Sequence, residues 1–290
     1  MGFAQLTEIT TRCEKENLRF WQVIRAEDCR ERDVTPERSF EDMREMYRAM
    51  QAADRDYDPK LRSASGMAGG DGEKFAAYRQ RENRLLGDYL TEVMERALKM
   101  AESNACMKRI VAAPTAGSCG VIPAVLLSYA SCRKAEEDRL VEALYVAAGI
   151  GEVIAESASI AGAEGGCQAE IGSASAMAAG ALAYLDGGTE ETIVHAAALA
   201  MKSLLGLTCD PVAGLVEVPC IKRNASGAVN AVVASQMALA GIRSAIPPDE
   251  VIDSMRRIGH LLPACLRETG QEGLAVTPTG LRIQKQMREA

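Results

Sequence analysis

The stretch EIGSASAMAAGALAYL, residues 170–185, decides the fold because Ala, Gly and Ser dominate it and its pattern indicates a helix. Segments 138–160, 189–206 and 225–243 are similar in composition and also indicate helices. Small side chains let helix axes approach closely, which suits a packed helical core. We therefore predict a mainly α-helical protein.

The composition changes near residue 110, where a polar part of the chain gives way to the Ala/Gly-rich part. We expect a single domain over residues 1–290, with 1–105 a polar helical N-terminal part and 106–290 the core that carries the site. A helix is predicted to begin at Thr35 as its N-cap. A second is predicted from about Glu73 to Glu102, after a loop.

Composition excludes several classes of protein. Aromatic residues make up 4% of the 290 residues, and the net charge of −7 argues against nucleic acid as a partner. No apolar run is long enough for a membrane span, and the first residues do not resemble a secretory signal. Nine cysteines without such a signal favour the reducing cytoplasm, where thiols fill cores, bind metals or react.

The segment APTAGSCGVIP, residues 113–123, breaks the chain just before an apolar helix. A loop at a helix N-terminus presents backbone N–H groups and small hydroxyls that can hold a carboxylate. Thr115, Gly117 and Ser118 are therefore candidates for binding substrate. An ordinary loop-to-helix junction explains the same residues.

Three cysteines lie in unusual surroundings. Cys167 follows two glycines that allow the backbone to approach its sulfur closely. Cys209 and Cys220 lie in a segment with two prolines, so we expect residues 208–224 to form an irregular loop. Three thiols at these spacings suit either a zinc site or a cubane iron–sulfur cluster, and spacing does not decide between them.

Polar residues accompany these thiols. Glu217, Lys222 and Asn224 are candidates for orienting substrate or supporting the ligands, and they also suit a surface ion pair. Lys222 and Arg223 carry positive charge that can balance an anionic metal centre.

Five blocks of sequence resemble the α subunit of bacterial iron–sulfur L-serine dehydratases. They are SGMAGGDGEKFAAY (65–78), PTAGSCGVIPA (114–124), EGGCQAEIGSASAMAAGA (164–181), GLTCDPVAGLVEVPCIKRNA (206–225) and ETGQEGLAVTPTG (268–280). The resemblance covers essentially the whole chain.

The resemblance implies a helical, cluster-binding catalytic domain. It implies that Cys167, Cys209 and Cys220 hold a [4Fe–4S] cluster with one open iron. It also implies iron-assisted β-elimination of water from L-serine, which yields pyruvate and ammonia. Cys119 falls in a matching block at a place where a small residue is expected, and we do not assign it as a ligand.

Two departures from the family bear on the partner. Single-chain members carry a Ser-Ser-Ser-His-Thr-type loop that this sequence lacks, so we expect a separate β subunit to supply the general base. The two histidines here, His195 and His260, are interpreted as structural. Some relatives end in a cysteine that covers the open iron, and we expect no such capping because this sequence ends in KQMREA.

Three alternatives stay open at this point. A pyridoxal-phosphate dehydratase would need a Schiff-base lysine at an α/β phosphate site, which the helical pattern disfavours. A zinc-binding or purely structural scaffold subunit would use the thiols differently. A cluster-dependent lyase acting on another β-substituted amino acid, such as threonine or cysteine, would differ in only a few pocket atoms.

Overall fold

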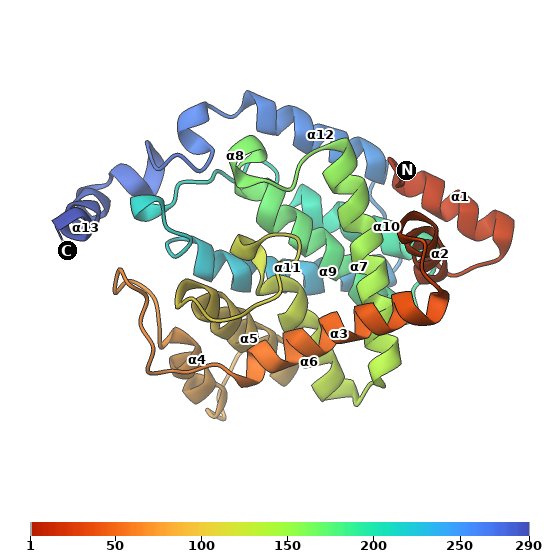
Figure 1. Ribbon diagram of the computed structural model, residues 1–290, viewed down its shortest axis with the longest axis horizontal. Helices are drawn as coiled ribbons and strands as arrows, with labels where there is room; N and C mark the ends of the chain where they lie inside the picture. Colours follow the sequence, from red (N-terminus) through yellow and green to blue (C-terminus); the bar gives the residue numbers. More distant parts are fainter. Residues whose placement is uncertain (1, 290) are drawn as a thin grey trace.

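The computed structural model describes residues 2–289 and is mainly α-helical, as the sequence predicts (Figure 1). The helices are α1 (Leu6–Glu16), α2 (Phe20–Arg32), α3 (Pro36–Arg55), α4 (Asp71–Arg79), α5 (Asp88–Ala105), α6 (Val121–Arg133), α7 (Glu137–Ser157), α8 (Gly162–Gly165), α9 (Ser173–Leu185), α10 (Glu190–Lys202), α11 (Cys220–Leu239), α12 (Pro248–Leu261) and α13 (Pro278–Glu289). Short turns of tighter or wider helix are η1 (Ala116–Ser118), η2 (Gln168–Gly172), η3 (Val212–Gly214), η4 (Ala264–Leu266) and η5 (Gly273–Val276). Among these residues the one β-type pairing is an isolated parallel bridge between Cys209 and Arg267.

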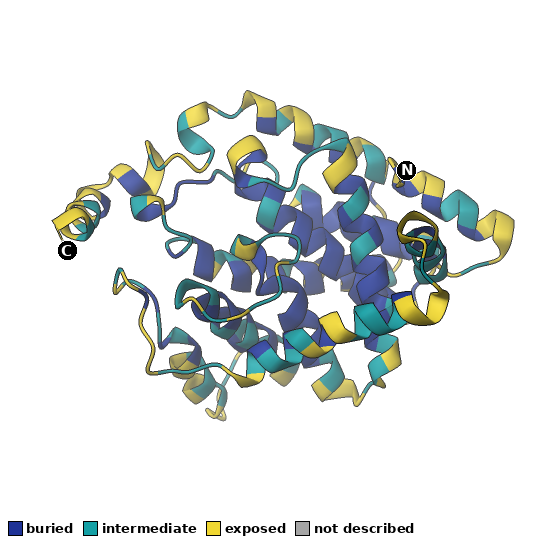
Figure 2. Cartoon of the chain, in the orientation of Figure 1, coloured by how far each residue is buried: buried dark blue, intermediate teal, exposed yellow. Residues whose placement is uncertain are grey.

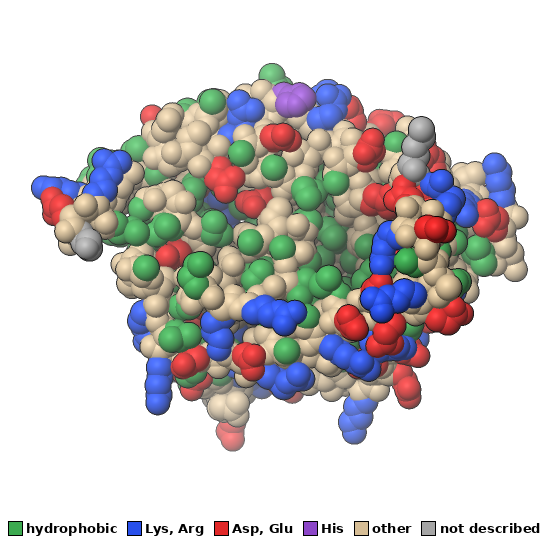
Figure 3. Space-filling view, viewed as in Figure 1, with side chains coloured by type: hydrophobic (Ala, Val, Ile, Leu, Met, Phe, Trp, Pro, Cys, Tyr) green, Lys and Arg blue, Asp and Glu red, His purple; other side chains and the backbone are tan. Residues whose placement is uncertain are grey.

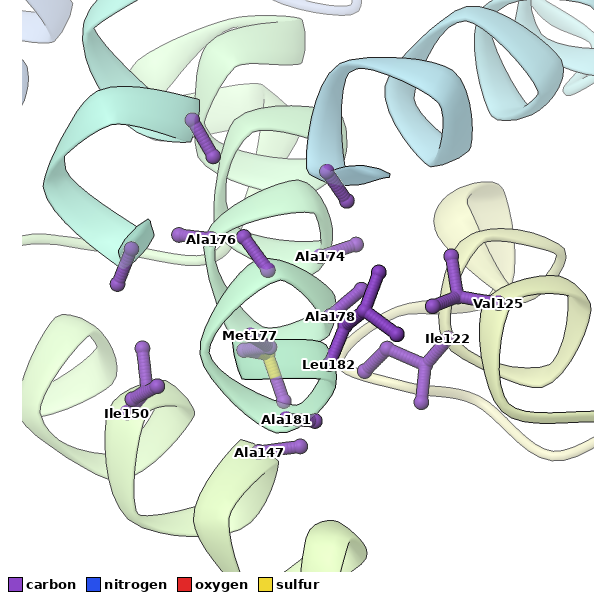
Figure 4. Packing of buried hydrophobic residues seen from close by; sticks show 14 of the residues in the cluster. Ile122, Val125, Ala147, Ile150, Ala174, Ala176, Met177, Ala178, Ala181 and Leu182 are labelled. Atoms are coloured by element: carbon purple, nitrogen blue, oxygen red, sulfur yellow. The ribbon is translucent and has the colours of Figure 1, made fainter. Parts of the chain in front are cut away.

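The centre of the fold is α9, whose residues are all buried. It packs against α6, α7, α10 and α11. In Figure 4, Ala178 and Leu182 of α9 lie toward Ile122 of α6, and Ala181 lies toward Ala147 of α7. Small side chains on a helix surrounded in this way let several neighbours approach its axis at once.

The other helices cover this centre. α2 and α3 pack against α7, α4 packs against α5, and α12 packs against α10. Figure 2 shows that burial is greatest in the central helices and falls toward α1, α12 and α13. One continuous cluster of buried apolar side chains extends from Phe3 to Met255. No helix among residues 2–289 is both long and apolar enough to cross a membrane.

Threonine caps account for two helix starts that the sequence predicts correctly. The Thr35 side chain accepts a hydrogen bond of 3.2 Å from the N–H of Arg38 at the start of α3. Thr189 does the same for Thr192 at the start of α10. Each cap satisfies an N–H that has no partner within the helix.

Two predicted boundaries are wrong. The helix expected over 73–102 is two helices, because an extended Gly87 caps α5 after a mostly exposed connection over 80–87. The loop expected over 208–224 ends at residue 219, because Pro219 can precede a helix without losing a helical hydrogen bond. α13 begins directly after Thr277, whose hydroxyl accepts from the N–H of Gly280 at 3.1 Å.

Gly180 of α9 tests whether close packing holds the centre together. A Cβ at this position would overlap Cδ1 of Ile150 and lie 3.4 Å from the carbonyl oxygen of Ile193. We predict that Gly180→Val lowers the free energy of unfolding by about 1–3 kcal/mol, measured by urea denaturation. Gly172→Ala is the control, because its Cβ would meet nothing closer than 3.8 Å. An equal loss in both variants would contradict this account of the packing.

Candidate metal centre

Three buried cysteines from separate segments gather beside the N-terminal end of α9. Cys167 immediately precedes η2, Cys209 follows α10, and Cys220 is the first residue of α11. They are 2%, 2% and 7% exposed. Burial raises the pKa of Cys209, and the nearby charges of Cys167 and Cys220 raise it further, so the three thiols are close enough to influence one another. All nine cysteines are free.

The Cys167 segment is tied to the chain that leads to Cys209. The N–H of Gln168 donates to the carbonyl oxygen of Leu207 at 3.0 Å, and the Gln168 side chain accepts from the N–H of Gly206 at 2.8 Å. Gly166 adopts φ +74°, and a Cβ there would lie 2.9 Å from the Leu207 oxygen. The glycine is therefore required for the close approach of the two segments.

Cys209 is held through its backbone. Its N–H donates to the carbonyl oxygen of Leu266 at 2.8 Å, and its own carbonyl accepts from Glu268 at 2.8 Å. These two bonds flank Arg267, which forms the isolated bridge with Cys209. The C-terminal segment thus fixes the backbone that presents the Cys209 thiol.

Arg223 links all three thiol segments. It lies on α11, one turn beyond Cys220, and its guanidinium donates to the carbonyl oxygen of Thr208 at 2.7 Å and to Asp210 at 3.1 Å. Burial raises the pKa of Cys167 to about 11, and the charge of Arg223 opposes that rise. Sequence reasoning recognised the charge of Arg223 but not this bridging position.

Two acidic residues that sequence reasoning missed lie beside Cys209. The carboxylate oxygens of Glu170 and Glu268 and the sulfur of Cys209 all lie within 4.8 Å of one another. Burial raises the pKa of Glu170, Glu268 raises it further, and a hydrogen bond of 2.9 Å from Thr115 opposes them. This mixed oxygen and sulfur set could hold a metal ion. For Glu170 the sequence offered one signal, namely its position three residues after Cys167.

Burial favours the protonated form of the three thiols. It raises the pKa of Cys220 to about 12, and Cys167 and Glu170 add to this rise. Since thiolates are the metal-binding form, loading this site must displace protons.

The structure brings the predicted 115–118 loop to the same place. The Thr115 hydroxyl bonds both Glu170 and, at 3.0 Å, the hydroxyl of Ser118. A Cβ on Gly117 would lie 3.0 Å from a Glu170 oxygen. Asn224 joins this loop to α11, because its side chain accepts from Gly120 at 2.8 Å and donates to the carbonyl oxygen of Gly117 at 2.7 Å.

Glu217 engages the segment before α4, and Lys222 engages the first residue of α4. The buried Glu217 carboxylate accepts hydrogen bonds from the hydroxyls of Ser63 and Ser65, at 2.8 and 2.6 Å. Lys222, about half exposed, forms an ion pair of 2.7 Å with Asp71. Both side chains therefore connect the cysteine-bearing region to residues 63–71.

A sequence profile described as serine dehydratase alpha chain matches residues 15–275. The chain belongs to the serine dehydratase alpha chain family. The probable L-serine dehydratase, alpha chain, of Bacillus subtilis (strain 168) is 44% identical over 283 residues, covering 98% of this chain and 93% of the relative. The L-serine dehydratase, alpha chain, of Peptoniphilus asaccharolyticus is 39% identical over 279 residues, covering 96% of each.

Some relatives are longer than this member of the serine dehydratase alpha chain family. The L-serine dehydratase TdcG of Escherichia coli (strain K12) is 47% identical over 184 residues, which are 62% of this chain and 40% of that protein. More than half of that longer chain therefore lies outside the match.

The histidines of this family member take part in other contacts. Nδ1 of His195 accepts from the N–H of Ser244 at 3.2 Å, and burial lowers the pKa of His195. His260 is exposed on α12. Neither is among the hydrogen-bond partners of the three thiol segments in the described residues.

Replacing Asn224 tests whether its side chain holds the 115–120 loop in place. Asn224→Ala leaves buried partners on Gly117 and Gly120 unpaired, so we predict a loss of about 1–3 kcal/mol and faster hydrogen exchange over residues 115–120. Asn230→Ala is a matched control on the same helix, because its amide donates to Ser175 at 2.9 Å and to Ala200 at 2.8 Å, outside the site.

The control should lose comparable stability without faster exchange over 115–120. Unchanged exchange in Asn224→Ala would contradict the positioning role.

Proposed function

We propose that this chain is the catalytic α subunit of an L-serine dehydratase, which converts L-serine to pyruvate and ammonia. Family membership over residues 15–275 carries the proposal. The activity is named in relatives that match over nearly their whole length. The reaction is a step of amino-acid degradation.

We further propose that Cys167, Cys209 and Cys220 hold a [4Fe–4S] cluster. The donor set fits the group, because three buried free thiols come from three separately anchored segments. Arg223 supports the assignment, since it places positive charge against an anionic assembly. When bound, the cluster would supply a Lewis-acidic iron that stabilises charge developing on the departing hydroxyl oxygen.

The chain's own residues would then bind and orient the amino acid. The Thr115–Ser118 loop offers hydroxyls beside Glu170. Asn224, whose amide is fully used within the protein, is better suited to hold this loop than to touch substrate. Glu217 and Lys222 similarly would hold residues 63–71 against the site.

We propose that a separate β subunit completes the enzyme and supplies the general base. The alpha-chain names of the relatives support a partner, as does the length of the longer relative outside the match. In this arrangement residues 106–290 carry the metal ligands, and 1–105 pack around them as part of one domain. Nine free thiols suit a cytoplasmic enzyme.

One observation favours a second candidate, a single-ion zinc site with a scaffold role. Glu170, Cys209 and Glu268 offer one sulfur and two carboxylates within reach of one ion, a donor set that zinc accepts. This site would not need Cys167 or Cys220. The two candidates therefore differ in which cysteines retain metal.

Metal analysis of cysteine variants tests the cluster proposal. We predict about four irons and four acid-labile sulfides per chain in anaerobically prepared protein. Cys167→Ala, Cys209→Ala and Cys220→Ala should each lose them, together with pyruvate formation when the β subunit is added. Cys119→Ala is the matched control, because Cys119 is fully buried and its thiol points to the carbonyl oxygen of Met100 instead.

Zinc without sulfide, retained in Cys167→Ala, would favour the single-ion site. Activity on threonine or cysteine in preference to serine would overturn the substrate assignment and leave the cluster intact.

A further inference from the structure

A pocket of ≈ 330 Å³ lies between α8, α12 and the segment that bridges Cys209. α8 and α12 lie side by side (Figure 1). Its polar lining comprises Ser159, Glu164, Arg256, His260 and Arg267. Figure 3 shows acidic and basic side chains intermixed on the face over these helices. The volume is at the lower end for small-molecule sites, so it suits a ligand of few atoms.

Arg267 has unused hydrogen-bonding capacity in this pocket. Its Nε is buried and has no hydrogen-bond partner. Its guanidinium donates one long hydrogen bond, 3.4 Å, from a terminal N–H to the carbonyl oxygen of Glu164. Within residues 2–289 no carboxylate lies within ion-pair distance of Arg267. A buried guanidinium N–H without an acceptor is costly, and a carboxylate is the acceptor that fits its planar fork.

A negative charge lines the same pocket. The Glu164 carboxylate accepts a hydrogen bond of 2.6 Å from the hydroxyl of Ser159 and forms no ion pair with Arg267. Arg256 is paired with Asp253 at 2.6 Å, but both side chains are largely solvated, so that pair is weak. The pocket thus presents cationic groups and a separate carboxylate to one small ligand.

We propose that this pocket binds a second molecule of a free α-amino acid, L-serine, with its carboxylate on Arg267 and its ammonium on Glu164. None of the lining residues belongs to the Thr115–Ser118 loop. The choice of serine rests on the proposed function, whereas the zwitterion chemistry rests on the lining residues. Met255 provides an apolar wall that suits a short side chain. Pyruvate shares the carboxylate but has no group for Glu164.

The pocket is coupled to the metal-binding segments by backbone contacts. Gly165 and Ala169, which flank Cys167, belong to its lining, and Arg267 bridges Cys209. An amino acid that fixes Arg267 therefore also fixes the segment that presents the Cys209 thiol. Binding of serine should consequently slow the loss of metal from the chain.

Calorimetric titration of the full chain tests the site, both as prepared anaerobically and after removal of metal. We expect L-serine to bind in both states. Arg267→Gln and Glu164→Gln should each weaken binding by about tenfold or more, because each loses a charge-assisted contact. Arg257→Gln is the control and should bind serine like the parent. Arg257 pairs with Asp253 at 2.8 Å, as Arg256 does, but Arg257 does not line the pocket.

Ligand analogues separate the possible sources of affinity. L-serinamide, which lacks the carboxylate, should lose most of the affinity in the parent chain. Pyruvate should bind more weakly than serine and should be insensitive to Glu164→Gln. Inorganic phosphate that competes as well as serine would overturn the amino-acid assignment in favour of a general anion site.

Thermal melts of each variant check that it folds. Arg267→Lys keeps the positive charge but loses the planar guanidinium, so it should bind serine with intermediate affinity. Absence of serine binding in the metal-free parent, or equal weakening in Arg257→Gln and Arg267→Gln, would overturn the proposal. If the anaerobically prepared chain held no iron or sulfide and still bound serine, the cluster proposal alone would fall and this pocket would stand.

Discussion

The fold depends on the burial of α9 on every side. A helix surrounded by four neighbours must carry small side chains, and Ala, Gly and Ser meet that requirement. The four neighbours are fixed against one helix. The chain that leads into α9 and the chain that leads into α11 therefore end at defined positions. Cys167 lies in the segment that leads into α9, and Cys220 is the first residue of α11. Close packing at the centre therefore positions these two candidate metal ligands at its edge.

The third thiol is positioned differently. Cys209 lies in irregular chain, and its place depends on two backbone hydrogen bonds to residues 266 and 268 and on the Arg223 guanidinium. Arg223 and Asn224 are consecutive on α11, yet they serve different partners: the first holds the Cys209 loop, and the second holds the loop that begins at Thr115. One turn of helix thus organises both the ligand segment and the polar loop beside it.

The helical class and the two threonine caps could be predicted from sequence because they depend on local pattern. The assignment of Cys167, Cys209 and Cys220 to a cluster came from a family resemblance, since spacing alone left zinc and a cluster equally open. Glu268 and the bridging role of Arg223 could not be predicted, because both depend on how irregular chain folds back. Glu268 lies 59 positions from Cys209, and the Arg223 side chain reaches Thr208, 15 positions away. The start of α11 at Cys220 was missed because two prolines indicated a longer loop than the packed helix allows.

The central claim is that three thiolates of this chain leave one metal position open. Mössbauer spectroscopy of chain reconstituted with ⁵⁷Fe, before and after addition of L-serine, tests it most directly. The account predicts that one of about four irons has a distinct signal and that serine shifts this signal alone. Equivalent irons that do not respond to serine, or iron without sulfide, would contradict it.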